Sequence, residues 1–352
     1  MRKPILISLG LAALGAGVYA YACRETRQYR REFIRAGNRA SEGKQLTLDG
    51  KSRRELGMLE GARHSEASSQ IISSTRDIAP APDDGVKRLR ILHISDLHLA
   101  RNEVQSKLDF LAEVTDDEYD FVFLTGDIFQ HDESIKHARH LLSRKPRIGA
   151  YAVLGNHDYY RYSMWNKIVG RIFPSMRHPA KITRDVKPLV RALKNVGYDV
   201  LLNEARYLED TEICLVGVDW PGIRKNKLLE LVSRSPGDWL VIALFHLPRD
   251  LEFYNDAGVH YAFGGHTHGG QIRVPGYGPI ITDSELARHE ASGITYRGRT
   301  TFHISRGLGA DPRTNFRLFC PPQASVIEIE VPANCSLANR MDFSVIGAPE
   351  RV

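Results

Sequence analysis

The sequence predicts an α/β domain in which strands and helices alternate. Short apolar runs rich in β-branched and aromatic residues recur from Leu89 onward, and amphipathic stretches of helical length separate the first of them. Polar residues follow each run almost at once. Strands that are joined through helices pair in parallel, so their carboxyl ends meet at one edge of a sheet. We therefore expect an α/β fold with its ligand site along that edge.

The bulk composition is that of an ordinary globular protein. Of its 352 residues, 26% are charged and 42% are hydrophobic, which excludes wholesale disorder and allows a sizeable core. The net charge of +6 is compatible with anionic lipid, nucleic acid or phosphorylated substrates and selects none of them. The four cysteines have no paired spacing, which argues against a zinc module or a disulfide framework. They are Cys23, Cys214, Cys320 and Cys335.

Residues 4–23 are expected to form a transmembrane helix. The stretch from Ile5 to Cys23 is 19 residues long and carries no charge. As a helix it would span about 28 Å, close to the thickness of a bilayer's hydrocarbon core. Tyr19 and Tyr21 suit the membrane–water boundary. Two alternatives remain open: a signal peptide cleaved after Ala22, and a lipoprotein lipidated on Cys23.

Basic residues flank this segment on both sides. Arg2 and Lys3 precede it, and six arginines lie within residues 24–39. The positive-inside tendency predicts a single-pass protein whose catalytic domain is cytoplasmic, with export followed by anchoring as the alternative. The arginines would also bind anionic lipid headgroups, so the bilayer is an expected partner.

The remaining organisation follows from composition. Residues 24–86 are expected to form a basic stalk and polar linker, because they lack apolar periodicity and become rich in serine and proline. Within them, 70–72 is a candidate for one short strand. Residues 87–331 are expected to form one domain, and 332–352 a C-terminal tail.

The elements of the domain are expected in a regular order. The first strands and helices are Leu89–Ile94, helix 104–117, Phe121–Leu124, helix 132–143 and Ile148–Leu154. After a helix near Val186–Leu193 come Ile213–Val218, Trp239–Phe245, Val259–Phe263, Thr300–Ile304 and Ala324–Val331.

The residues that follow these strands form a candidate metal site. They are Asp96, His98, Asp127, Asn156, His157, His246, His266 and His268. Oxygen and imidazole donors without a thiolate suit manganese, which we expect, or iron, zinc or magnesium. The set exceeds what one tetrahedral ion needs, so two ions are expected, about 3.5–4 Å apart and bridged by a carboxylate such as Asp127. Two such cations polarise a phosphoryl oxygen and lower the pKa of a bridging water.

Each of these residues also has a structural interpretation when it is taken alone. Asp96 and Asn156 are ordinary turn residues, Asp127 is a possible helix cap, and His246 could be a buried histidine with satisfied hydrogen bonds. Together, these interpretations would require every block to arise by chance. Other histidines, such as His93 and His303, are assigned structural roles. No nucleophile elbow, Walker A run or basic–aromatic platform is present, so a nucleic-acid partner is not expected.

The order of these blocks resembles that of a known family. Asp96-x-His98, Gly126-Asp127, Gly155-Asn156-His157-Asp158, His246 and Gly265-His266-x-His268 are similar to the five blocks of the calcineurin-like metallophosphoesterase superfamily. The resemblance covers about Leu89 to Val331. It implies a four-layer αββα sandwich with two mixed sheets, here preceded by the transmembrane helix.

The resemblance also implies a role for each site residue. One metal would be held by Asp96, His98, Asp127 and His268. The other would be held by Asp127, Asn156, His246 and His266. His157 is similar to the family's non-ligand histidine, which contacts the scissile phosphate, and Asp158 would orient it.

Further segments resemble a membrane-attached bacterial branch of the superfamily. They are Gly269–Gln271, Ser305–Gly309 and Phe319–Pro322, while Gln323 stands where that branch would have glutamate. The branch includes the chlamydial-type UDP-2,3-diacylglucosamine pyrophosphatase of lipid A synthesis, which forms UMP and 2,3-diacylglucosamine 1-phosphate. This resemblance implies that reaction at the bacterial inner membrane. The alternatives are a broad-specificity phosphodiesterase acting on membrane phospholipid or cell-envelope phosphodiesters, and a non-catalytic binding scaffold.

Residues 159–183 are expected to be an insertion that faces lipid. Apolar and basic residues recur there at helical spacing, which is typical of a helix lying in a membrane interface. The candidates for substrate or lid contacts are Trp165, Lys167, Arg171 and Phe173. The alternative is that this face packs on the domain as ordinary core.

Overall fold

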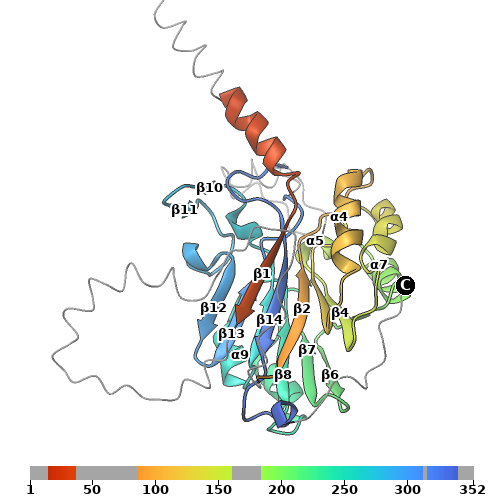
Figure 1. The fold of residues 1–352 in the computed structure, drawn as a ribbon, viewed down its shortest axis with the longest axis vertical. Helices are drawn as coiled ribbons and strands as arrows, with labels where there is room; N and C mark the ends of the chain where they lie inside the picture. Colours follow the sequence, from red (N-terminus) through yellow and green to blue (C-terminus); the bar gives the residue numbers. More distant parts are fainter. Residues whose placement is uncertain (1–14, 37–85, 161–183, 312–314, 340–352) are drawn as a thin grey trace, which may run out of the picture.

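The computed structural model describes residues 15–36, 86–160, 184–311 and 315–339. A helix over 15–25 leads into the domain from one end (Figure 1). None of the helices within these ranges is long and apolar enough to cross a membrane. Much of the expected 4–23 segment, the candidate strand at 70–72 and the four candidate lid residues fall outside the described residues.

Two six-stranded sheets form the centre of the domain. The first has the order β1-β14-β2-β3-β4-β5 and the second β12-β13-β9-β8-β7-β6. The first sheet comprises β1 (Arg30–Ala36), β2 (Arg88–Ile94), β3 (Phe121–Thr125), β4 (Gly149–Val153), β5 (Tyr198–Val200) and β14 (Gln323–Glu330). The second comprises β6 (Glu204–Leu208), β7 (Ile213–Gly217), β8 (Leu240–Leu244), β9 (Tyr261–Gly264), β12 (Gly293–Arg297) and β13 (Thr300–Ile304).

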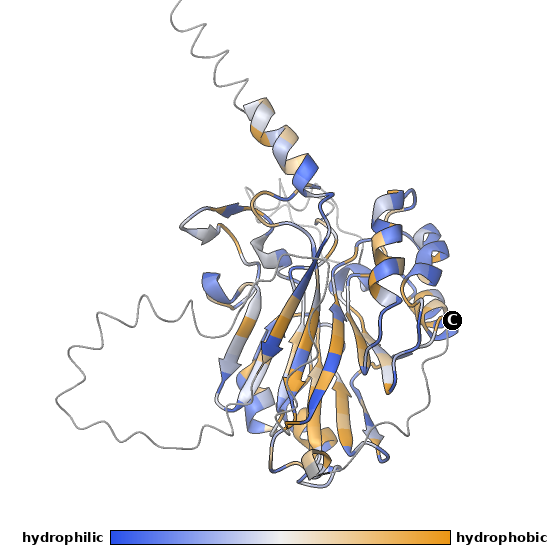
Figure 2. Cartoon of the chain, viewed as in Figure 1, coloured by the Kyte–Doolittle hydropathy of each residue, from blue (hydrophilic) through white to orange (hydrophobic). Residues whose placement is uncertain are grey.

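Both sheets are mixed, as the family resemblance implied. In the first, β2, β3, β4 and β5 are parallel, while β14 runs antiparallel to β2. In the second, β7, β8, β9 and β13 are parallel, and β6 and β12 are antiparallel to their neighbours. Strands β3, β7, β8 and β9 are buried throughout and β4 nearly so, and these strands are coloured mainly as hydrophobic in Figure 2.

Helices cover the outer face of each sheet. The helices of the first sheet are α4 (Gln105–Thr115), the 3₁₀ helix η2 (Asp132–His140) and α7 (Lys187–Asn195). Those of the second are α8 (Lys225–Ser233) and α9 (Glu252–Asp256). The described residues form three apolar cores. One lies between the two sheets, and each sheet has one more between it and its helices. The layers therefore run helix, sheet, sheet, helix.

The structure corrects several boundaries of the sequence analysis. Residues 30–36, expected in the stalk, form the edge strand β1, which pairs in parallel with β14 and buries Ile34 between the sheets. The expected helix at 132–143 is a 3₁₀ helix. Part of the expected tail is core, because Cys335 and Leu337 are buried.

The unexpected strand β1 also explains Gln323. The side-chain amide of Gln323 donates a hydrogen bond to the carboxylate of Glu32 in β1, and Gln323 is buried. Burial raises the pKa of Glu32. A glutamate at 323 would place a second carboxyl group against the first, whereas glutamine supplies a donor.

Candidate metal centre

The carboxyl ends of five strands bring the seven predicted ligands together. Asp96 and His98 follow β2, and Asp127 follows β3. Asn156 opens the short helix α5 (Asn156–Tyr159) after β4. His246 follows β8, and His266 and His268 follow β9. Because both sheets place these ends at the same edge, residues distant in sequence meet there.

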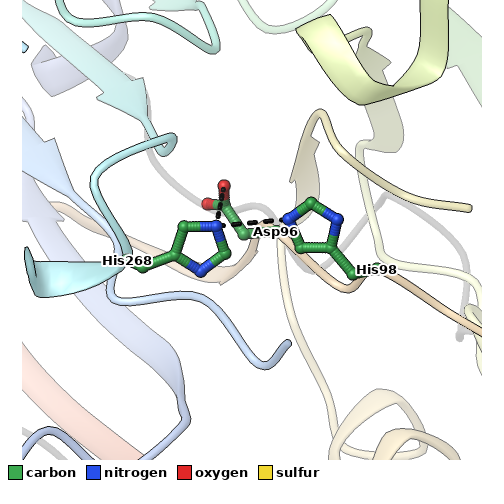
Figure 3. A group of neighbouring side chains, drawn as sticks. All are labelled: Asp96, His98 and His268. Atoms are coloured by element: carbon green, nitrogen blue, oxygen red, sulfur yellow. Dashed lines mark hydrogen bonds and ion pairs between the residues drawn. The ribbon is translucent and has the colours of Figure 1, made fainter. Parts of the chain in front are cut away.

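The first group consists of Asp96, His98 and His268 (Figure 3). One potential ligand atom from each lies within 4.8 Å of the others. The Nε2 atoms of His98 and His268 are 3.2 Å apart, and Nε2 of His268 is 3.6 Å from Oδ1 of Asp96. All three residues are buried. These are three of the four ligands expected for one metal.

The second group consists of Asp127, His246 and His266, with Asn156 beside them. Nε2 of His246 lies 3.3 Å from Oδ2 of Asp127 and 3.2 Å from Nδ1 of His266. The same Nδ1 atom lies 3.1 Å from Oδ1 of Asn156. These are the four ligands expected for the other metal.

One oxygen of Asp127 faces both groups. Its Oδ2 atom lies 3.6 Å from Nε2 of His98 in the first group and 3.3 Å from Nε2 of His246 in the second. The other oxygen, Oδ1, accepts a hydrogen bond of 2.8 Å from the backbone N–H of His157. A carboxylate held in this way can bridge two cations, which is the role predicted for it.

The donor set and its spacing fit two divalent cations. In each group two ring nitrogens converge to 3.2 Å. Nitrogen–metal bonds of about 2.1 Å place two ligand nitrogens about 3.0–3.4 Å apart at angles between octahedral and tetrahedral. The set has four imidazoles, three side-chain oxygen donors and no thiolate, so it suits manganese, iron or zinc and differs from a structural cysteine-type zinc site.

The buried charges of the site shift one another's pKa values. Burial lowers the pKa of His246, but Asp127 and Asp96 outweigh it and raise that pKa to about 10. Burial raises the pKa of Asp96 to about 6 and lowers that of His98 to about 3. Burial also acts to raise the pKa of Asp127, yet the neighbouring histidines hold it well below its usual range. Asp127 is therefore anionic and ready to bind cations.

The backbone beneath the ligands is strained. Five of them have positive φ angles although none is glycine. They are Asp96 (49°), His98 (44°), Asp127 (54°), His266 (73°) and His268 (52°). Two glycines next to His268 also have positive φ angles, Gly269 (62°) and Gly270 (82°). Gly265 allows close approach, since a Cβ there would collide with the side chains of Ser95 and Asp96.

His157 and Asp158 do different work. His157 lines the metal-site cavity, and its ring lies 4.7 Å from that of His98, edge to face. The Asp158 carboxylate accepts hydrogen bonds from the backbone N–H groups of Asp127, Ile128 and Gly155, at 2.9–3.0 Å. These bonds join the loops that carry Asp127 and Asn156, and the role of Asp158 in orienting His157 stays a prediction.

Sequence reasoning missed the buried Arg317, which lies behind His268. Its guanidinium donates to the backbone carbonyls of His268, Gly307 and Cys320, at 3.2–3.3 Å. It therefore ties together three loops at the site. One of its nitrogens also lies 3.2 Å from Nδ1 of His268. Nothing in the local sequence marks this arginine, because its partners are carbonyls far along the chain.

His93 and Thr125 are hydrogen-bonded to each other, and Thr125 is hydrogen-bonded to His246 of the site. The Thr125 carbonyl accepts a 2.8 Å hydrogen bond from Nδ1 of His246, which leaves Nε2 of that ring facing Asp127. The Thr125 hydroxyl is hydrogen-bonded to Nε2 of His93 at 2.8 Å, and Nδ1 of His93 lies 2.7 Å from Nδ1 of His303. His93 and His303 therefore have the structural roles predicted for them, and Thr125 connects His93 to His246 of the metal site.

Two cavities border the ligand cluster. One, of about 190 Å³, is lined by the ligands Asp127, His266 and His268 and by the apolar Ile280 and Ile281. The other, of about 250 Å³, has His246 in its lining. Aromatic and cationic side chains contribute to its walls, namely Trp220, Phe253, Tyr254, Arg224 and Arg249. The first cavity therefore contains three isoleucines among polar residues, and the second combines aromatic side chains with two arginines and two aspartates.

The chain belongs to the calcineurin-like phosphoesterase family, whose model matches residues 89–270. Its members are metal-dependent phosphohydrolases with a dinuclear divalent metal centre, and the two ligand groups described above are the candidate ligands here.

Three relatives illustrate the range of the family. The chain is 30% identical over 252 residues to the uncharacterized metallophosphoesterase YkoQ of Bacillus subtilis, covering 69% of this chain and 84% of the relative. It is 26% identical over 254 residues to the phosphodiesterase YaeI of Escherichia coli, covering 70% and 84%. It is 28% identical over 283 residues to the UDP-2,3-diacylglucosamine pyrophosphatase LpxG of Chlamydia trachomatis, covering 66% and 81%.

Proposed function

We propose that the protein hydrolyses UDP-2,3-diacylglucosamine to UMP and 2,3-diacylglucosamine 1-phosphate at the membrane, as a step in lipid A synthesis. The reaction adds one water across a P–O–P linkage and breaks one P–O bond. The observation that carries the proposal is that the ligand groups border two cavities, one that combines aromatic side chains with two arginines and two aspartates, and one that contains three isoleucines among polar residues. In this proposal the nucleotide contacts the aromatic and arginine side chains, and an acyl chain contacts the isoleucines.

The residues of the site divide the work of hydrolysis. Two divalent cations, when bound, polarise phosphoryl oxygens and lower the pKa of a bound water. Asp127 would hold them a fixed distance apart, because its Oδ2 faces both groups. His157, which lines the cavity without belonging to either ligand group, would contact the scissile phosphate and protonate the leaving oxygen.

A broad-specificity phosphodiesterase is the second candidate. The likeness to the phosphodiesterase YaeI favours it about as strongly as the likeness to LpxG favours the first. Both reactions need the same metal centre and differ in what the flanking cavities must bind. A non-catalytic scaffold is a third alternative, but a scaffold has no need for seven converging ligands.

The deciding experiment identifies products. Purified full-length protein with Mn²⁺ is incubated with UDP-2,3-diacylglucosamine, and products are measured by mass spectrometry, with Asp127→Ala as control. Release of UMP by the parent alone supports the proposal. No UMP at high enzyme, together with hydrolysis of bis-p-nitrophenyl phosphate, would favour the phosphodiesterase. No hydrolysis of either compound would favour the scaffold.

We also propose that residues 4–23 anchor the protein in the bacterial inner membrane with the catalytic domain in the cytoplasm. The support is the uncharged sequence from Ile5 to Cys23 and the six arginines that follow it. A reporter fused after Arg54 tests this topology. Activity of a reporter that works only in the periplasm would contradict it and favour export.

A further inference from the structure

The exposed apolar side chains of the protein are gathered at one end. Ten large apolar side chains are exposed in the described part of the chain, and eight of them lie in the helix over 15–25, in residues 274–281 or at Phe319. We define the apolar rim as the five that belong to the domain itself. They are Val274, Tyr277, Ile280, Ile281 and Phe319.

The apolar rim is continuous with the metal-site cavity. Ile280 and Ile281 line that cavity together with the predicted ligands. Val274 and Tyr277 lie on the hairpin formed by β10 (Arg273–Val274) and β11 (Gly278–Pro279). Arg273 pins this hairpin to the site, since its guanidinium donates to the carbonyl of Gly269 at 3.2 Å.

The rim is also joined to the helix over 15–25. The backbone N–H of Phe319 donates to the Glu25 carboxylate at 2.6 Å, and the ring of Phe319 lies 5.6 Å from that of Tyr21. Phe319 has a φ of 52°, an unfavourable conformation for a bulky side chain, yet it is 47% exposed. Figure 1 shows the helix and the hairpin projecting from the same end of the domain.

We propose that the apolar rim inserts into the lipid bilayer surface, so that the metal-site cavity opens at the lipid–water interface. The chain on the amino side of the described helix supports a bilayer as the occupant, because residues 5–14 carry no charge. Arginines around the rim complement anionic headgroups. They are Arg24 in the helix, Arg27 just after it, Arg273 in β10, and Arg288, whose guanidinium lies 4.3 Å from the Tyr277 ring centre.

This arrangement gives the rim a purpose beyond anchoring. A lipid-borne phosphoester would pass from the bilayer over Ile280 and Ile281 to the ligands without its apolar part crossing water. The hairpin would fix the distance between the cavity and the membrane surface. An anchor joined to the domain at one point would not fix that distance. The inference concerns docking and holds for any lipid phosphoester.

Spin-label accessibility tests the proposal on the full chain. Single cysteines replace Val274, Tyr277 and Val86 in a Cys23→Ser background, in which the other native cysteines are buried. Val86 is the matched control because it is 43% exposed, like Val274, but precedes the amino end of β2, opposite the site. Each labelled protein is reconstituted into vesicles of phosphatidylcholine with phosphatidylglycerol.

We expect the labels at 274 and 277 to be more accessible to oxygen than to a water-soluble nickel chelate, and the label at 86 to show the reverse. Nickel accessibility at 274 and 277 equal to that at 86 would overturn the proposal. So would protection from both reagents, which would indicate a protein partner or a second copy. Hydrolysis of bis-p-nitrophenyl phosphate by the same proteins tests the metal centre separately, so failure of either idea is recognised on its own.

Discussion

Asp127 and the two histidines after β9 divide the candidate metal centre into two ligand groups. His268 lies with Asp96 and His98, whereas His266 lies with Asp127 and His246. The sequence motif alone would also allow both histidines to chelate one ion. The positive φ angles of both residues turn their rings toward different groups, and no propensity rule would have predicted that strain.

We predict that His266→Ala and His268→Ala each lose one metal, and that the metal lost differs. Hydrolysis should fall at least about 100-fold in both, because even indirect partners of metal ligands cost 10–100-fold. Metal analysis and the Mn²⁺ spectrum of each variant check this, with the exposed His289→Ala as control. Loss of the same single metal in both variants would show that the histidines share an ion.

A second prediction concerns Gly155. A Cβ at this position would collide with Oδ1 of Asp127 and lie 2.8 Å from Nε2 of His246. We expect Gly155→Ala to cost about 1–3 kcal/mol of stability and to weaken metal binding as Asp127 moves. Gly237→Ala is the control, since a Cβ there meets nothing within 4 Å. Equal metal affinity in the two variants would contradict the packing described.

At the scale of elements, the sequence predicted the buried strands and missed the exposed or irregular ones. Phe121–Leu124 and Thr300–Ile304 are apolar runs whose strands begin where expected. β1 and β6 were not predicted, because they are edge strands with polar, half-buried residues and no regular alternation of apolar and polar residues. The metal ligands could be predicted because they end parallel strands, whereas Arg317 could not, since its role depends on tertiary contacts.

Ile34 tests whether β1 is part of the fold. We predict that Ile34→Ala lowers the free energy of unfolding by about 2–4 kcal/mol, because its side chain is buried in the core between the sheets. The neighbouring Arg35 is exposed on the other side of the strand, and its ion pair with Glu328 is worth little. Arg35→Ala should therefore be almost neutral. Equal denaturation midpoints for the two variants would contradict the assignment of residues 30–36 to the folded domain.

Arg317 offers a test of the loops at the site. Arg317→Met keeps an apolar stem but leaves several buried carbonyls without a donor, so we expect a loss of about 3 kcal/mol in chemical denaturation. Metal affinity should fall chiefly for the group that contains His268. The exposed Arg299→Met serves as control. If Arg317→Met left the free energy of unfolding unchanged, the loops at the site would not depend on Arg317 for their stability.

At the scale of the whole molecule, strands of both sheets end at the edge that carries the candidate metal centre. Each sheet supplies part of the ligand set, and the core between the sheets holds Asp127 of the first opposite His246 of the second. The helix over 15–25 and the hairpin of β10 and β11 project from the same end of the domain in Figure 1, and two residues of the apolar rim line the metal-site cavity. The candidate metal centre and the surface that we propose to dock on the membrane therefore share one end of the domain, while the opposite end carries the amino end of β2.

The central claim is that hydrolysis depends on two cations held jointly through Asp127. The most direct measurement is a Mn²⁺ titration of metal-free, full-length protein, followed by hydrolysis of bis-p-nitrophenyl phosphate and by metal analysis. We predict no hydrolysis without metal and full hydrolysis only when about two ions are bound per chain, with Asp127→Ala inactive at every concentration. Full activity with one ion per chain, or an active Asp127→Ala variant, would contradict the account.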